Sequence, residues 1–325
     1  MARRKLRHKE STSSKIKNRV ITLFLALIMF CGLQSYSASS LKFAQVSDVH
    51  FSTGTSNTTY KLTAESPKLF EDAVNRINET PDINFVMFTG DQIDKSFERE
   101  LTAFLEYAEK LIYPWYTVFG NHDTCIGGFL TPEVYLKLVK SHNLNFDFVT
   151  PYYSFTPQKG YKVIVLDTII RDRLTANGYM SEEQIEWLDN QIKTSPKDTI
   201  LIFMHVPIIE PFNSPNHRLL NADEVESVLN KYKNPIAVFQ GHYHAAKITR
   251  KDNILYVSTP ALVSYPNAFR IITVTNYRNR AVFDIQTKDT RLTNLQKLAK
   301  IMVFGSVIYS GEEKDQNGIY VIKKK

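Results

Sequence analysis

The chain has 325 residues, which is enough for one large domain or two small ones, and its 43% hydrophobic and 22% charged residues are ordinary for a soluble globular protein. Its net charge of +7 is concentrated at the amino terminus, because residues 1–20 hold eight of the 40 basic side chains and one of the 33 acidic ones. The rest of the chain is therefore balanced in charge, and the sequence shows no basic surface of the kind that binds nucleic acid.

The basic residues are followed by a short apolar run over residues 20–33 and then by small polar residues. A positive head, a short apolar segment and small residues near a cleavage point predict a secretory signal over residues 1–38. The alternative is an uncleaved membrane anchor through residues 20–33, although a spanning helix needs about 20 residues. We therefore expect an extracytoplasmic protein, periplasmic or secreted. It can form no intramolecular disulfide once the signal is removed, since Cys125 is then its single cysteine.

Strands and helices alternate after the signal. Apolar runs over residues 41–46, 84–89 and 113–119 are typical of buried strands. Between them, residues 66–78 and 97–111 carry apolar side chains at helical spacing. This order predicts parallel strands joined by right-handed crossovers, and therefore an α/β fold.

The pattern continues with a helix over 131–141, strands over 152–156 and 161–167, a helix capped at Ser181, and then strand 199–204, helix 222–232 and strand 235–240. Short strands at turn spacing take over between residues 247 and 286, and we expect them to form a second, antiparallel-rich sheet packed against the first. Residues 39–288 would form this domain. Residues 289–325 predict a helix followed by a hairpin over residues 307–322, and we expect this segment to be an appendage.

Five of the predicted strands end in side chains that suit metal ions. Ligand sites in open α/β sheets lie outside the carboxyl ends of the strands, so we expect these side chains to converge on one site. Carboxylate, imidazole and amide groups without thiolate suit Mn, Fe, Zn, Co or Ni better than Ca or Cu(I). The residues are Asp48 and His50, Asp91, Asn121 with His122 and Asp123, His205, and His242 with His244.

Each of these motifs alone is weak evidence, because a loop histidine is more often a structural or solvated residue than a ligand. The agreement among five strand ends is difficult to explain by core packing, since these ends carry five of the chain's eight histidines. The remaining histidines, His8, His142 and His217, are not assigned to the site.

The order Asp-x-His, Gly-Asp-x-x-Asp, Gly-Asn-His-Asp, a lone His and Gly-His-x-His resembles the calcineurin-like metallophosphoesterase superfamily over about residues 41–288. The Asp-x-His opening and the sequence around His205 are more similar to the branch that contains bacterial cyclic-nucleotide phosphodiesterases. The resemblance implies a four-layer α-β-β-α sandwich of two mixed sheets flanked by helices.

The resemblance also implies residue roles. One divalent metal ion would be held by Asp48, His50, Asp91 and His244, and a second by Asp91, Asn121, His205 and His242, with Asp91 bridging the two. A metal-activated hydroxide would attack the phosphorus. His122 would protonate the leaving group, with Asp123 holding its far ring nitrogen. Asp94 would brace the site and not bind metal.

We therefore expect an exported binuclear-metal phosphoesterase acting on small-molecule phosphodiesters, phosphomonoesters or both. Three alternatives stay open. The first is a 3',5'-cyclic-nucleotide phosphodiesterase, whose substrate is mainly cytoplasmic. The second is a membrane-surface lipid phosphoesterase, which the N-terminal apolar segment suggests. The third, a metal-free binding scaffold, is disfavoured because all seven ligand positions are filled. The sequence specifies neither the alcohol, the native metals nor the oligomeric state.

Overall fold

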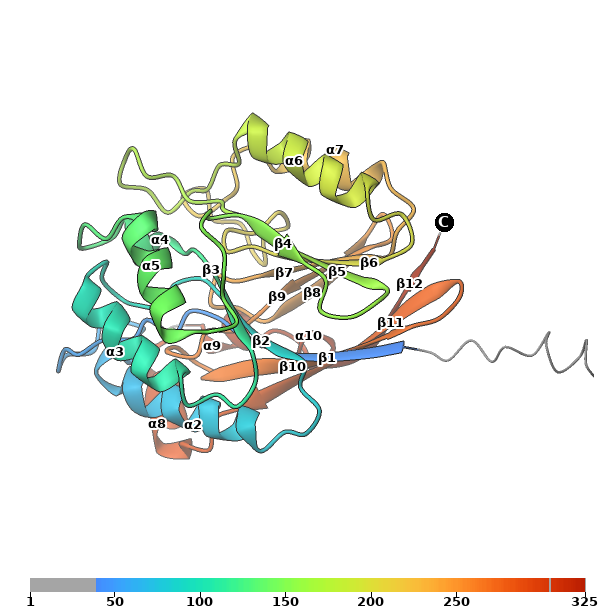
Figure 1. Ribbon diagram of the computed structural model, residues 1–325. Helices are drawn as coiled ribbons and strands as arrows, with labels where there is room; N and C mark the ends of the chain where they lie inside the picture. The colour runs from blue at the N-terminus through green and yellow to red at the C-terminus, as the bar shows by residue number, and fades with distance from the viewer. Residues whose placement is uncertain (1–38, 304, 325) are drawn as a thin grey trace, which may run out of the picture. The chain divides into compact units, whose positions relative to one another are not determined.

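Two mixed six-stranded sheets carry the fold (Figure 1). The strands of the first sheet are, in spatial order, β12 (Asn317–Lys323), β11 (Arg280–Asp289), β10 (Ala268–Asn276), β1 (Ser39–Val46), β2 (Phe85–Thr89) and β3 (Trp115–Val118). Those of the second are β4 (Tyr153–Phe155), β5 (Tyr161–Val165), β6 (Thr199–Phe203), β7 (Ile236–Gln240), β9 (Ile254–Ser258) and β8 (Lys247–Lys251).

The computed structural model describes residues 39–303 and 305–324, which belong to one compact unit. The predicted secretory signal and the alternative anchor over residues 20–33 lie outside the described residues and stay predictions. Within the described part of the chain, no helix has both the length and the apolar character that crossing a bilayer requires.

The helices connect the strands and cover the sheets. They are η1, a short 3-10 helix (Thr63–Glu65), α2 (Ser66–Asn78), α3 (Glu98–Ala108), α4 (Asn121–Thr124), α5 (Pro132–His142), α6 (Glu182–Lys193), α7 (Ala222–Asn230), α8 (Thr293–Met302), α9 (Ser306–Ser310) and α10 (Glu313–Gln316). Figure 1 shows α2 and α3 outside the first sheet and α6 and α7 outside the second. This order of layers confirms the predicted α-β-β-α sandwich.

Helix α2 shows how the sequence forms the outer layers. A proline in the first turn suits the helix start, because the missing N–H would have no partner there. Leu69, Phe70, Ala73, Val74 and Ile77 recur at helical spacing and are all buried. One face of the helix therefore packs on the sheet, as the spacing predicts.

The parallel arrangement of the central strands is also confirmed. Strands β1, β2 and β3 are parallel neighbours in the first sheet. Strands β5, β6, β7 and β9 are parallel neighbours in the second. The carboxyl ends of parallel strands lie at the same edge of a sheet. The loops that follow the central strands therefore lie at one edge of each sheet.

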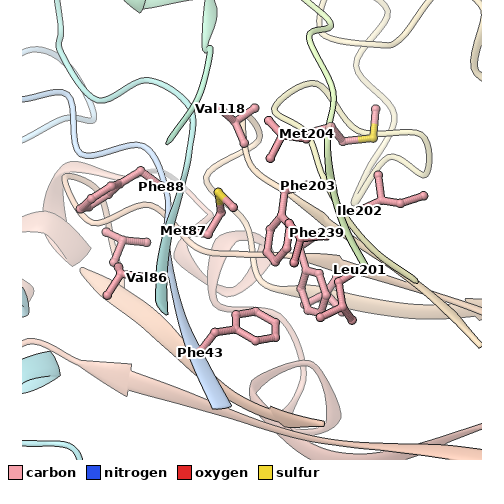
Figure 2. Close-up of a cluster of buried hydrophobic side chains, with 14 of the residues drawn as sticks. Phe43, Val86, Met87, Phe88, Val118, Leu201, Ile202, Phe203, Met204 and Phe239 are labelled. Atoms are coloured by element: carbon pink, nitrogen blue, oxygen red, sulfur yellow. The ribbon is translucent and has the colours of Figure 1, made fainter. Parts of the chain in front are cut away.

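Phe43, Phe203 and Phe239 lie together between the two sheets, with Met87 and Leu201 beside them (Figure 2). The ring of Phe43 on β1 stacks on Phe85 of β2, with 5.0 Å between centroids. It also meets the edges of Phe203 and Phe239 from the second sheet, at 5.4 and 5.1 Å. These contacts hold the inner faces together, and edge-to-face rings favour one relative placement of the sheets.

The expected separate sheet over residues 247–286 is wrong. Strands β8 and β9 join the second sheet beside β7, whereas β10 and β11 join the first sheet beside β1. The physical reason is that both β1 and β7 would otherwise leave an open edge with unpaired backbone groups. Each hairpin covers one of these edges.

The expected hairpin over residues 307–322 is also wrong. The segment forms α9, α10 and the single strand β12, which pairs antiparallel with β11 in the first sheet. Arg270, fully buried on β10, donates hydrogen bonds to the backbone oxygens of Asp315 and Gln316. Residues 289–325 therefore include an integral strand of the sheet and are not an appendage.

We expect Phe43→Ala to lower the free energy of unfolding by about 3–5 kcal/mol, because it leaves a cavity between the two sheets where four rings meet. Urea unfolding monitored by circular dichroism measures the change. Phe129→Ala is the matched control, since Phe129 is 95% exposed and should change stability by less than about 0.5 kcal/mol. Equal effects of the two substitutions would contradict this account of the core.

Candidate metal centre

The predicted site residues gather where the carboxyl edges of the two sheets meet. Asp48 and His50 follow β1, Asp91 follows β2, and Asn121 follows β3. The second sheet supplies His205 after β6 and both His242 and His244 after β7. The structure thus brings all seven predicted ligand positions together, and each of the two sheets contributes some of them.

One group of donors forms around His50 and His244. Their Nε2 atoms lie 3.2 Å apart, and His244 Nε2 lies 3.4 Å from Asp48 Oδ1. His50 Nε2 is also 3.4 Å from Asp91 Oδ2. Asp48, His50 and His244 are buried and close enough to hold one metal ion.

A second group forms around His205. Its Nε2 lies 3.4 Å from Asp91 Oδ2, 3.2 Å from Asn121 Oδ1 and 3.1 Å from His242 Nδ1. Asp91, His205 and His242 could hold another metal ion. The same oxygen, Asp91 Oδ2, therefore faces both groups, which is the position that a bridging ligand requires.

The geometry and chemistry of these donors fit divalent metal ions. Ligands of a tetrahedral ion with bonds of about 2.0–2.1 Å lie roughly 3.3–3.4 Å from one another, and the measured separations are close to this. In two places a pair of buried imidazole nitrogens lies only 3.1–3.2 Å apart. Without a cation such a pair is unfavourable, because at most one proton can lie between the two nitrogens. His242 Nε2 is buried with no hydrogen-bond partner among the described residues, so its Nδ1 carries the polar contacts of that ring.

Contacts behind the ligands fix which ring nitrogen faces the site. His205 Nδ1 lies 2.9 Å from the backbone oxygen of Thr89 and so donates to it. His244 Nδ1 is 3.0 Å from Ser264 Oγ. In both rings, Nε2 is left for the donor cluster. Partners of this kind orient metal-ligating histidines and select the tautomer.

The backbone is strained at five of the seven ligand positions. Asp48, His50, Asp91, His242 and His244 all have positive φ, between 42° and 72°, a region that residues other than glycine rarely adopt. Such strain costs on the order of 1–3 kcal/mol per residue and persists where the surrounding structure enforces it. Its concentration here indicates a functional site.

Gly90, immediately before Asp91, shows how closely the loops of the site are packed. Its φ is 93°, and an added Cβ would lie 2.1 Å from Nδ1 of His205. A larger residue would therefore displace a ligand of the second group. The glycine in this motif serves the close approach of the two sheets' loops.

The electrostatics of the cluster favour ionised carboxylates. Burial by itself would raise the pKa of Asp48, but the adjacent His244 imidazole lowers it to about 2. Burial likewise opposes the shift at Asp91, where His205 and His122 hold the pKa well below its ordinary value. Burial disfavours the charged form of His205, yet Asp91 and Asp48 raise its pKa to about 9. The carboxylates thus attract cations to this pocket.

The expected pairing of Asp123 with the His122 ring is wrong. His122 Nδ1 lies 2.6 Å from the backbone oxygen of Asp94, to which it donates. The Asp123 carboxylate instead accepts from the backbone N–H groups of Gly120 and Ile93, at 2.7 and 3.2 Å. Burial, followed by the neighbouring Asp91 charge, raises its pKa well above the usual range. Asp123 therefore braces the loop, and Asp94 orients the imidazole.

Some residues near the site were not predicted from the sequence. The ammonium of Lys61, a buried residue, lies 2.7 Å from Asp94 Oδ1 and 3.2 Å from His50 Nδ1, so it supports a ligand from behind. Lys61 lies in the polar loop between β1 and η1, and no local pattern in the sequence marks it. His217, left unassigned, has its ring centroid 5.3 Å from that of His242.

Comparisons with known proteins agree with the expected family and fold. A family model described as calcineurin-like phosphoesterase matches residues 41–246. A 3',5'-cyclic-nucleotide phosphodiesterase of Nostoc is 26% identical over 226 residues, which cover 68% of this chain and 78% of that protein. A probable glycerophosphodiester phosphodiesterase of Arcobacter nitrofigilis is 27% identical over 192 residues, covering 57% of this chain and 64% of that protein.

A dimetal phosphatase from Danio rerio has a similar crystal structure, with a TM-score of 0.64 over 88% of this chain and 99% of that one. The two sequences are 16% identical, so this likeness concerns the fold.

We expect the protein to bind two divalent ions and Asn121→Ala to retain one high-affinity site, because Asn121 contacts only the second group of donors. Asp91→Ala should weaken both sites, since Oδ2 faces both groups. Calorimetric titration of metal-stripped protein with Mn²⁺ or Zn²⁺ measures the stoichiometry. Asp147→Ala, an exposed carboxylate, is the control. Unchanged binding of two ions by Asp91→Ala would contradict the bridging position.

Proposed function

Because the chain belongs to the calcineurin-like phosphoesterase family and is a metal-dependent hydrolase, we propose that it acts on small molecules outside the cytoplasm and hydrolyses their phosphodiester bonds, their phosphomonoester bonds or both. The observation that carries this proposal is the pair of buried donor groups that face one oxygen, Asp91 Oδ2. A site of this kind suits a phosphoryl group, whose oxygens can span two cations.

The two ions, when bound, supply Lewis-acid activation of water and neutralise charge on the phosphoryl oxygens. The side chains that would hold one ion are Asp48, His50, Asp91 and His244, and those that would hold the other are Asp91, Asn121, His205 and His242. Their oxygen and nitrogen donors suit Mn, Fe, Zn, Co or Ni.

The chain's own groups then position the reaction. The backbone N–H of His122 donates to Asp91 Oδ1 at 2.9 Å, which fixes the carboxylate and directs Oδ2 toward both donor groups. Hydrogen bonding of His122 Nδ1 to Asp94 leaves Nε2 for the substrate. As water attacks phosphorus, it releases a proton to solvent and the bond from phosphorus to the alcohol oxygen breaks. His122, protonated on both ring nitrogens, would give that oxygen its Nε2 proton and then regain a proton from solvent.

The proposal names a class of ester and not one alcohol. The relative from Nostoc supports a cyclic nucleotide, and the relative from Arcobacter nitrofigilis, at about the same identity, supports a glycerophosphodiester. Export is proposed from the basic and apolar composition of residues 1–38. A retained segment over residues 20–33 would tether the enzyme to the membrane.

The test is to strip the metals, add back each of the five candidate ions, and assay bis(p-nitrophenyl) phosphate and p-nitrophenyl phosphate. We expect metal to restore hydrolysis and Asp91→Asn to remove at least about 99% of it. The ratio of the two rates chooses between diesters and monoesters. In cells that produce the full chain, the activity should appear outside the cytoplasmic fraction.

Metal binding without turnover of either ester would contradict the hydrolase, and absence of metal binding would favour a scaffold. Asp147→Ala is again the control, because its carboxylate is exposed.

We expect His122→Ala to slow hydrolysis of an alkyl phosphodiester by about 10²–10⁴-fold, because an alkoxide needs a proton as it leaves. Hydrolysis of a p-nitrophenyl ester should fall much less, since p-nitrophenolate leaves without protonation. Rates for both esters with the variant and with His142→Ala, a histidine that pairs with Glu109, provide the measurement. Equal losses for the two esters would assign His122 to a role other than proton donation.

A further inference from the structure

A pocket of about 250 Å³ adjoins the metal centre. Its wall includes the candidate metal ligands His242 and His244, so a group held in the pocket would lie next to the bound phosphoryl group. The rest of the wall is mostly aromatic. It consists of Tyr60, Phe212, Tyr243 and Tyr309, together with Ser214 and His217.

The aromatic side chains support one another. The ring of Phe212 meets Tyr243 edge to face, with 5.1 Å between centroids and 76° between planes. It meets Tyr309 in the same way at 5.9 Å and 79°. Tyr243 Oη donates to the Glu210 carboxylate at 3.1 Å, which holds its ring in place. The pocket thus presents preformed ring surfaces to a ligand.

Tyr309 comes from the carboxyl-terminal segment, far along the chain from the metal motifs. Its backbone oxygen accepts a hydrogen bond of 2.8 Å from the N–H of Ala246, two residues after His244. Gly311 lies so close to the loop containing Ala246 that an added Cβ would be 2.3 Å from the backbone oxygen of Ala246. The segment is therefore fitted directly against the loop that carries the metal ligands.

A buried polar cluster holds the same segment in position. The Asp315 carboxylate is fully buried and accepts from the backbone N–H of Ile248 at 3.0 Å, with the ammonium of Lys247 at 3.2 Å. The guanidinium of Arg270 donates to the backbone oxygen of Asp315 at 2.7 Å. Because these partners belong to both sheets, the placement of α9 follows from the fold itself.

We propose that Tyr309 completes a specificity pocket that selects phosphoesters whose alcohol carries a planar aromatic ring. The proposal rests on the proposed phosphoesterase function and deepens it. A cavity of about 150 Å³ can hold benzene, so the volume here is sufficient for a ring and the first atoms of a linker. Ring faces and edges at the wall favour a planar group over a saturated one of equal size.

The charges around the pocket disfavour a cationic ligand. Aromatic walls can also bind quaternary ammonium groups. Among the described residues that line this pocket, however, none is Asp or Glu, and the adjoining site would hold two divalent cations. These ions would repel an ammonium group and leave a neutral ring unaffected.

Tyr309 lies in the carboxyl-terminal region of the chain. The family model matches residues 41–246, and Tyr309 lies well beyond that match. Both Phe212 and Tyr60 lie in loops that follow site motifs, so the three rings come from three distant parts of the sequence.

The experiment measures binding of phenylphosphonate, cyclohexylphosphonate and methylphosphonate to the metal-loaded full chain by calorimetry. Phosphonates have no leaving alcohol, so affinity is separated from chemistry. We expect phenylphosphonate to bind at least about tenfold more tightly than methylphosphonate, with cyclohexylphosphonate between them. Tyr309→Ala should remove most of this difference by weakening phenylphosphonate binding, whereas Tyr309→Phe should keep it.

Val307→Ala is the matched control, because Val307 is 76% exposed on the same helix as Tyr309. Equal affinity for phenyl and cyclohexyl compounds, or an unchanged preference in Tyr309→Ala, would overturn the assignment of the pocket. Tighter binding of 2-(trimethylammonio)ethylphosphonate than of phenylphosphonate would overturn it in favour of a cation site. Metal binding without affinity for any phosphonate would overturn the proposed function itself.

Discussion

The shared carboxylate oxygen of Asp91 is the point on which both halves of the metal centre depend. It faces His50, which follows a strand of the first sheet, and His205, which follows a strand of the second. Buried imidazoles and carboxylates this close together are costly unless cations or protons compensate their lone pairs and charges. The fold therefore holds the metal-ligand side chains in place before an ion binds.

The hydrophobic core provides the rigidity that this arrangement needs. Phe43 contacts rings from both sheets, and those contacts set how the carboxyl edges of the sheets approach one another. The backbone is strained at Asp48, Asp91 and His242, and strain of this kind persists only where the surrounding structure enforces it. The packed core therefore keeps the metal-ligand side chains in place, because close-packed interiors transmit small shifts and do not absorb them.

The carboxyl-terminal segment is held beside the substrate pocket by buried contacts, just as the core holds the residues of the metal centre. Asp315 and Arg270 are buried polar groups whose partners lie on strands of both sheets and on the segment itself. A buried charged group is tolerated only when it is well paired, so this cluster admits few alternative placements of the segment. That cluster and the backbone hydrogen bond to Ala246 hold Tyr309 in position.

Sequence analysis was sufficient to predict the alternation of helices and strands, the parallel central strands and the residues that gather at the strand ends. Those features follow from local periodicity and from short motifs such as the one containing Asn121 and His122, which are readable without knowing distant contacts. The sheet edge that each late strand covers became clear from the tertiary structure alone, because nothing in the sequences of β8 and β10 specifies the open edge that each of them joins. The tertiary structure also decided that Asp94, and not Asp123, orients His122, and that Lys61 and Tyr309 reach the site. These contacts join residues far apart in sequence, and no local pattern encodes a partner that only the packing of two sheets brings within reach.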